Sequence, residues 1–135
     1  MTPDAQNIAI AESLGKTGIL RHKRPEHMRR DSAESDFVIT VESESGGREE
    51  LPNYTGSLDA CAKFEAALPE EKQSDYAWYL VQICDPFERF SIWKSPNDLA
   101  IWEMSLSDCF TCASAKPAQR CEAYLRTIGK WQESN

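Results

Sequence analysis

A chain of 135 residues with 41% hydrophobic and 27% charged residues has the size and composition of one globular domain, which excludes disorder throughout. Its net charge of −7 argues against binding DNA through the overall electrostatic field. The chain has no apolar stretch long enough to span a bilayer and no secretory signal, so we expect a cytoplasmic protein without a membrane partner. Its five cysteines, an odd number, are then expected to be free thiols.

Capping residues and apolar spacing predict helices near both ends and in the middle of the chain. Thr2 and Ser57 are good N-cap residues, and Pro117 suits the first turn of the last helix. Gly15 and Gly129 are natural helix stops. The predicted helices cover residues 2–14, 57–67, 70–83 and 117–129.

The segment 70–83 is open to two interpretations. Its second half, YAWYLVQIC, is aromatic and almost entirely apolar, which is also compatible with a strand. The preceding PEEKQ is a strong helix start, because negative charge is favoured at a helix N-terminus. We therefore favour a helix and keep the strand as the alternative.

Strand chemistry occurs in two parts of the chain. In residues 37–42, FVITVE, Phe37, Ile39 and Val41 alternate with the other side chains. After Asp85-Pro86, short strands are predicted at 87–93 and 99–104, with a further candidate at 108–113. The stretches 16–36 and 43–50 lack an apolar period and are predicted to be loops. The expected fold is a single α+β domain over residues 1–135, with helices packed on a small antiparallel sheet and a charged loop or insertion at about 16–50.

The C-terminal segment AKPAQRCEAYLRTIGKW, residues 115–131, resembles the closing helix of small bacteriophage accessory proteins. The segments NIAIAE at 7–12, LPNY at 51–54, SLDA at 57–60 and LPEE at 68–71 are similar to the same group, which is related to the phage ABA-sandwich domain family. The resemblance covers about half of the chain, and Lys116 stands where these proteins often have a capping threonine. It implies a viral origin and a small antiparallel sheet between helices, and it carries over no catalytic residue.

Two motifs suggest chemistry, but their context argues against it. Gly15-Lys16-Thr17 resembles the end of a phosphate-binding loop, but Ile10 occupies the required glycine position and the triplet follows a helix instead of preceding one. Cys109 and Cys112 form a CxxC pair, but tetrahedral zinc needs four ligands and no second pair or nearby histidine is present. We therefore expect buried thiols and no metal.

No group of residues predicts catalysis. The two histidines, His22 and His27, lie in the charged loop, where a solvated side chain is the more common state. The carboxylate pairs Glu49-Glu50 and Glu70-Glu71 lie in a loop or at a helix start, where solvent and the helix dipole account for them. We expect no enzyme and no cofactor.

The most unusual local feature is the basic block RHKRPEHMRR at 21–30, in an otherwise acidic chain. Arginine binds phosphate with two donors at once, and an exposed tryptophan can stack on a base. Together with the setting that the bacteriophage resemblance implies, the block suggests a phage anti-defence protein that sequesters a nucleotide-type immune signal, with a homo-oligomer as a further expectation. An inhibitor that binds a host immune or regulatory protein is the alternative, and a structural role in the phage particle stays open. The candidate ligand-binding residues are Arg21, Lys23, Arg24, Arg29, Arg30, Trp93 and Trp102.

Overall fold

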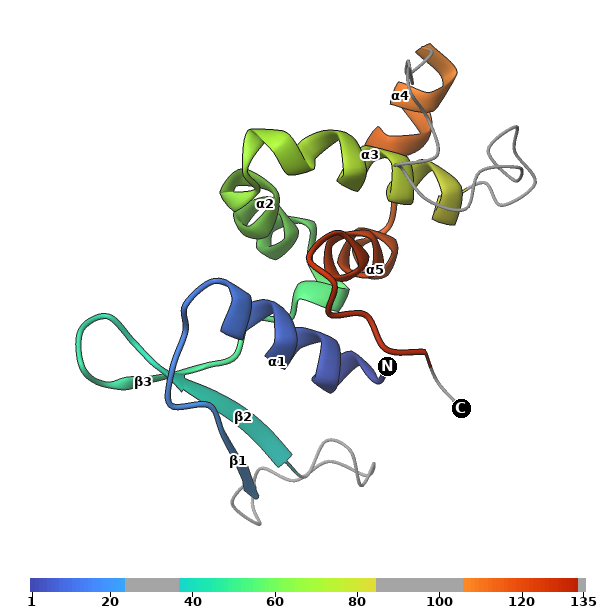
Figure 1. Cartoon of the computed structure of the whole chain (residues 1–135). Coiled ribbons are helices and arrows are strands. Elements are labelled where there is room, and N and C mark those ends of the chain that lie inside the picture. Colours follow the sequence, from blue (N-terminus) through green and yellow to red (C-terminus); the bar gives the residue numbers. More distant parts are fainter. Residues whose placement is uncertain (24–36, 85–105, 134–135) are drawn as a thin grey trace.

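The computed structural model describes residues 1–23, 37–84 and 106–133, and its helices and three-stranded sheet confirm the α+β class (Figure 1). The predicted strands at 87–93 and 99–104 lie outside the described residues. In chain order the elements are α1 (Pro3–Ser13), β1 (Leu20–Lys23), β2 (Phe37–Glu42), β3 (Arg48–Glu50), the 3-10 helix η3 (Tyr54–Gly56), α2 (Leu58–Ala67), α3 (Glu70–Cys84), α4 (Leu106–Ala113) and α5 (Pro117–Thr127).

The first helix has the start and the stop that the sequence predicts. The Thr2 hydroxyl accepts the N–H of Ala5 at 3.1 Å and caps the N-terminus of α1. Gly15 adopts a φ of +82°, which only glycine takes up without strain, and its N–H donates to Glu12 O at 3.0 Å. The N–H of Lys16 donates to Ala11 O at 3.0 Å, which completes a Schellman motif.

The segment 70–83 is helical, which settles the helix-or-strand alternative. Helix α3 runs from Glu70 to Cys84, and its two first-turn glutamates favour the positive end of the helix dipole. Tyr76, Trp78, Leu80 and Val81 are its buried residues. Tyr76 and Leu80, one helical turn apart, pack in the same hydrophobic cluster as Cys121 and Leu125 of α5.

Helix α4 corrects the prediction of a strand at 108–113. The segment folds as a helix from Leu106 to Ala113, with Asp108 in its first turn. Arg120 of α5 donates to Cys112 O and Ala113 O, each at 3.1 Å, and so binds carbonyls that the end of a helix leaves without intrahelical partners. These contacts come from a residue that lies outside the segment, so local sequence does not reveal them.

The sheet is antiparallel with the strand order β1-β2-β3. Strand β2 confirms the prediction for residues 37–42, whereas β1 and β3 correct the predicted loops at residues 20–23 and 48–50. All residues of β1 and β3 are exposed, so neither strand has the alternation of apolar and polar residues that marks a half-buried strand. Pairing with β2 makes them strands, in a register that joins Leu20 to Thr40 and Thr40 to Glu50.

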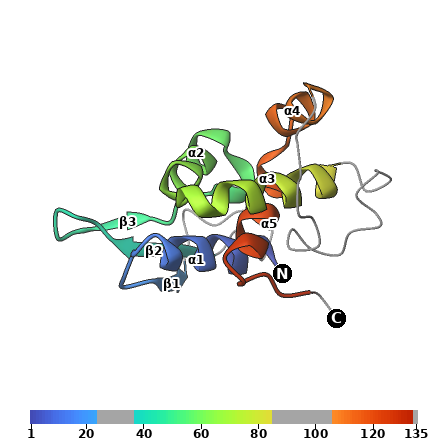
Figure 2. The same cartoon turned by 45° about the horizontal axis from the view of Figure 1, so that its top comes forward.

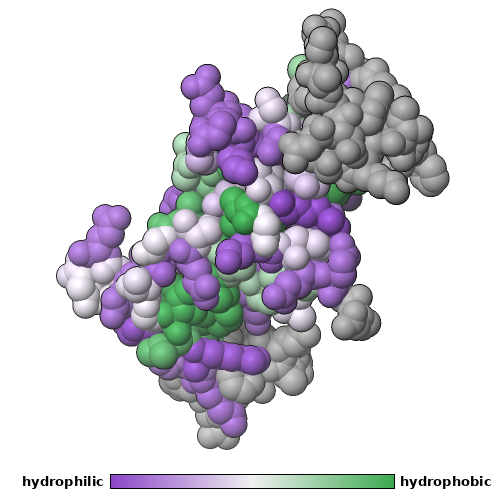
Figure 3. Space-filling model, viewed as in Figure 1, coloured by the Kyte–Doolittle hydropathy of each residue, from purple (hydrophilic) through white to green (hydrophobic). Residues whose placement is uncertain are grey.

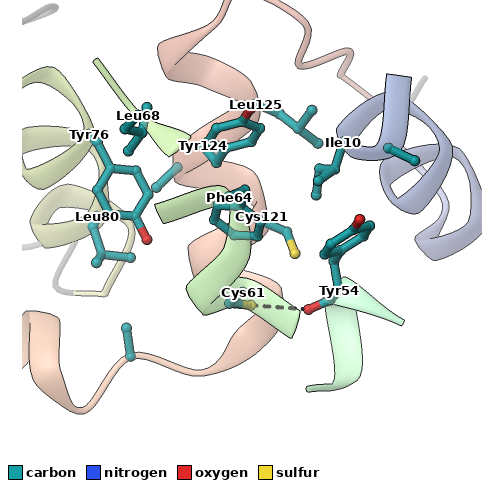
Figure 4. Packing of buried hydrophobic residues seen from close by; sticks show 13 residues of the cluster. Ile10, Tyr54, Cys61, Phe64, Leu68, Tyr76, Leu80, Cys121, Tyr124 and Leu125 are labelled. Atoms are coloured by element: carbon teal, nitrogen blue, oxygen red, sulfur yellow. Dashed lines mark hydrogen bonds between the residues drawn. The ribbon is translucent and has the colours of Figure 1, made fainter. Parts of the chain in front are cut away.

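Helix α5 lies at the centre of the helices, and the sheet lies beside α1 at the edge of the molecule (Figures 1 and 2). The Phe64 and Tyr124 rings, from α2 and α5, have centroids 4.5 Å apart in the middle of the core (Figure 4). Tyr124 also shares a hydrogen bond of 2.7 Å with the Ser13 hydroxyl of α1. Helix α5 begins at Pro117, as the sequence predicts, and the N–H of Lys116 before it donates to the Gln119 side chain at 2.8 Å.

Candidate ligand-binding site

The predicted basic block begins on a strand of the sheet. Arg21 and Lys23 of β1 pair with Ile39 and Phe37 of β2, and directly opposite residues share a face of a sheet. His22, between them, belongs to the other face. All three side chains are exposed, so β1 presents positively charged or protonatable groups on both of its faces.

A polar cluster forms where the three strands meet on the His22 face. The Thr40 hydroxyl lies 3.0 Å from His22 Nε2 and also accepts from Arg48 Nε at 3.0 Å. Arg48 Nη2 donates to Thr40 O at 3.1 Å and to Gly18 O. Arg48 therefore ties β3 to β2 and to the segment before β1. The alternation of 37–42 predicts the face of Thr40, but its two partners lie in segments that were expected to be loops.

Acidic groups partly balance these cations. Glu42 accepts from the Thr17 hydroxyl at 3.0 Å, and Lys16 pairs with Glu49 at 3.7 Å. Lys16 is the cation of the Gly15-Lys16-Thr17 motif, so the ion pair with Glu49 engages it. The motif follows α1, as expected, and does not precede a helix. The described part of the site is thus an exposed surface of mixed charge that can bind a ligand through hydrogen bonds and charge.

The structure describes two of the seven candidate residues, Arg21 and Lys23. The other five, together with His27, lie outside the described residues, so whether they join β1 in one site stays a prediction. They are Arg24, Arg29, Arg30, Trp93 and Trp102.

A partly buried polar cluster lies away from the sheet, between the helices. Glu65 Oε2 of α2 accepts from Tyr76 OH at 2.6 Å and from Arg120 Nη1 at 3.0 Å. Burial and the hydrogen bond to Glu65 raise the pKa of Tyr76 well above its ordinary value, so the phenol remains a proton donor. Arg120 additionally donates to three carbonyls near the end of α4, those of Cys112, Ala113 and Ala115. The cluster fixes four helices relative to one another, and sequence analysis did not identify it because its members are distant along the chain.

The cysteines divide into two groups, and the exposed Cys109 corrects the expectation of buried thiols. Cys61 and Cys121 are fully buried in the core, and the Cys61 thiol donates to Tyr54 O at 3.2 Å (Figure 4). The hydrogen bond with Cys61 and burial raise the pKa of Cys121. Cys84, Cys109 and Cys112 lie on α3 and α4 and are partly or fully exposed. Within residues 1–23, 37–84 and 106–133, no three His, Cys, Asp or Glu side chains are grouped as a metal site requires.

Among the described helices, none has the length and apolar character that crossing a membrane requires. Searches against protein-family models, curated proteins and solved structures found no match to this chain. The resemblance to bacteriophage accessory proteins therefore stays a prediction from the sequence.

Proposed function

We propose that this chain is a non-enzymatic binding protein that uses strand β1 to hold an anionic, phosphate-bearing ligand. In the setting that the bacteriophage resemblance implies, the ligand is a nucleotide-type immune signal that the protein sequesters in the host cytoplasm. The observation that supports this function best is the run Arg21-His22-Lys23, exposed on a paired strand in a chain of net charge −7.

Placement on a strand suits this task. Pairing with β2 fixes the backbone of β1, so its side chains lose less conformational entropy on binding than those of a mobile loop. Arg21 and Lys23 lie on the same face, two residues apart, which is a spacing of about 7 Å along a strand. Two cations at that separation can contact different oxygens of one phosphate group or of two adjacent groups.

The remaining candidate residues complete the proposed site. Arg24, Arg29 and Arg30 follow β1 directly and would add phosphate contacts, and Trp93 or Trp102 would stack on a base. Sequestration needs no bond to break, so the ligand would be recovered unchanged on denaturation. A homo-oligomer is part of the proposal.

An inhibitor of a host protein is the second candidate function. The side chain of Phe110 on α4 favours it, because it is 75% exposed and large aromatic residues are enriched in protein interfaces. The acidic surface would then steer the chain towards a basic partner.

Native mass spectrometry of the protein purified from phage-infected, immune-competent cells tests the proposal. We expect a bound mass of a few hundred to a thousand daltons, roughly one nucleotide to a small cyclic oligonucleotide, released on denaturation. A protein without bound small molecule contradicts sequestration, and a bound host polypeptide supports the second function instead.

Titration calorimetry with ATP and cyclic di-GMP then tests the residues. We expect the double variant R21A/K23A to weaken binding by roughly tenfold or more, because each charge-assisted hydrogen bond contributes about 1.5–3 kcal/mol. The variant K63A/K72A removes the same charge from exposed positions on α2 and α3 and should bind like the unaltered protein. Equal losses in both variants would show a general charge effect, and an unchanged affinity in R21A/K23A and in R24A/R29A/R30A would contradict the site.

A further inference from the structure

Two thiols of unequal exposure lie on one turn of α4. Cys109 and Cys112 are three residues apart in the helix, so their side chains occupy neighbouring positions on its surface, with Cβ atoms about 5–6 Å apart. Cys109 is exposed, whereas Cys112 is half-buried and packs against the hydrophobic core. The Cys109 thiol is therefore accessible to reagents from solvent, and the Cys112 thiol lies next to it on the helix surface.

Arg120 is hydrogen-bonded to the same turn of α4 that contains Cys112. Arg120 Nη2 donates to Cys112 O and Ala113 O, each at 3.1 Å, and Nε donates to Ala115 O at 3.0 Å. Nη1 of the same guanidinium donates to Glu65 at 3.0 Å. A change in the backbone at Cys112 thus reaches the contact between α2 and α5 through a single side chain.

We propose that Cys109 and Cys112 form a peroxide-sensitive dithiol site. Oxidation joins them by a disulfide within α4 and weakens the hydrogen bonds between Arg120 and the end of that helix. The site is separate from strand β1 and does not depend on the function proposed above.

The chemistry needs a peroxide and no other reactant. The Cys109 thiolate attacks one oxygen of hydrogen peroxide, an S–O bond forms, the O–O bond breaks, and the departing hydroxide takes up a proton to become water. The Cys112 sulfur then attacks the sulfenic sulfur, an S–S bond forms, and the second hydroxide leaves with the Cys112 proton as water. Two thiols are oxidised to one disulfide, and one peroxide is reduced to two waters.

The surroundings assign the order of the two steps. Burial, with smaller contributions from the neighbouring Cys84 and Cys109 thiols, raises the pKa of Cys112 to about 11. A thiol with a raised pKa is seldom the thiolate that attacks peroxide, so Cys109 reacts first. Cys112 serves as the resolving thiol.

Oxidation has a structural consequence because a disulfide needs shorter distances than a regular helix provides. The Cβ atoms of a disulfide lie about 3.5–4.5 Å apart, closer than the about 5–6 Å between helical positions i and i+3. The last turn of α4 must therefore distort, and its carbonyls move relative to Arg120. We expect the amides of 106–115 to exchange hydrogen roughly tenfold faster in the oxidised protein.

Peptide mapping tests the pairing directly. The reduced full-length protein is treated with hydrogen peroxide, alkylated in denaturant and digested with trypsin, which yields residues 95–120 with both cysteines and residues 73–89 with Cys84. We expect residues 95–120 to lose two hydrogens, to resist alkylation and to regain both thiols with dithiothreitol. Oxidation of Met104 adds an oxygen and is distinguished by mass.

The variant C109S is the matched control, because it changes an exposed side chain and leaves the core intact. It should form no disulfide and should show no change in hydrogen exchange after peroxide. A bond between residues 95–120 and 73–89 would overturn the proposed pairing in favour of Cys84. Five alkylated thiols, or a sulfinic acid at Cys109 with Cys112 still free, would overturn the dithiol site itself.

Discussion

Tyr54 combines a well-packed ring with a hydroxyl that has no partner among the described residues. The side chain is fully buried, and its ring lies 6.1 Å from that of Phe64. A buried polar group without a hydrogen bond costs about 1–3 kcal/mol. We predict that Y54F raises the free energy of unfolding by about 1 kcal/mol in urea denaturation. A loss of stability would mean that the hydroxyl has a partner, such as an ordered water.

The same residue gives the protein a pH dependence. Burial raises the pKa of Tyr54 from its ordinary value of 10.0 to about 12. Because the folded-state pKa lies above the unfolded one, the stabilisation is complete below pH 10 and is lost as the pH rises towards 12. We predict that Y54F flattens the fall in melting temperature over this range, measured by circular dichroism. An identical alkaline profile in Y54F would show that other groups set it.

Arg120 is a polar residue whose loss should strongly destabilise the protein. It is hydrogen-bonded to Glu65 and to three carbonyls, with only 14% of its side chain exposed and 27% of Glu65. We predict that R120M lowers the free energy of unfolding by about 3 kcal/mol, because it leaves a half-buried carboxylate and several carbonyls without their donor. The variant R126M is the control, since its ion pairs lie nearer the surface and should cost about 1 kcal/mol or less. Equal losses in urea denaturation would contradict a special role for Arg120.

At the scale of elements, two helices end in the same way. Gly129 adopts a φ of +74° after α5, and the N–H groups of Gly129 and Lys130 donate to Arg126 O and Leu125 O, at 3.2 and 2.8 Å. A Cβ at Gly129 would meet no atom within 4 Å, so only the backbone conformation resists substitution. We predict that G129A lowers the free energy of unfolding by about 1 kcal/mol. Urea denaturation of both variants measures the difference, and G47A should be close to neutral, because Gly47 lacks a positive φ and has room for a Cβ.

These endings explain why sequence analysis placed most helices correctly. Thr2, Ser57, Gly15 and Gly129 act within their own helices, so their signals are local. Strand β2 was equally readable, because Ile39 and Val41 are buried while Thr40 is not. Elements that depend on distant partners were missed, since β1 has no buried residue and α4 has carbonyls that bind Arg120.

Part of the candidate site could likewise be predicted from local sequence, and part of it could not. Arg21 and Lys23 stood out by charge alone, and both are exposed on the structure. The convergence of His22 and Arg48 on Thr40 was not predictable, because it depends on the register of three strands, two of which have no apolar alternation. An alternation of apolar and polar residues predicts a strand only where one face of the strand packs against a core. Strands with two exposed faces lack this alternation.

At the scale of the whole molecule, the main hydrophobic cluster and the charged surface of the sheet lie in different places. Among the described residues, the main buried hydrophobic cluster consists of side chains from the helices and their connections, whereas Ile39 and Val41 of β2 are buried outside this cluster. The sheet lies to one side of these helices, where hydrophilic residues and an apolar patch share the surface (Figure 3). Substitutions on the exposed positions of β1 should therefore change binding without unfolding the protein.

Two sets of substitutions distinguish the two candidate functions, and the salt dependence tests the charged contacts of the first. If phosphates bind to β1, raising NaCl from about 0.05 to 0.5 M should weaken ATP or cyclic di-GMP binding by roughly tenfold, because the Debye length falls from about 14 to about 4 Å. F110S should leave that affinity unchanged, since α4 and the sheet lie at opposite ends of the group of helices (Figures 1 and 2). If the chain instead inhibits a host protein through α4, F110S should weaken the captured complex by roughly tenfold or more, and R21A/K23A should not. Calorimetry of both variants, R21A/K23A and F110S, decides between a charged site on the sheet and an apolar site on the helix. Each variant is the control for the other.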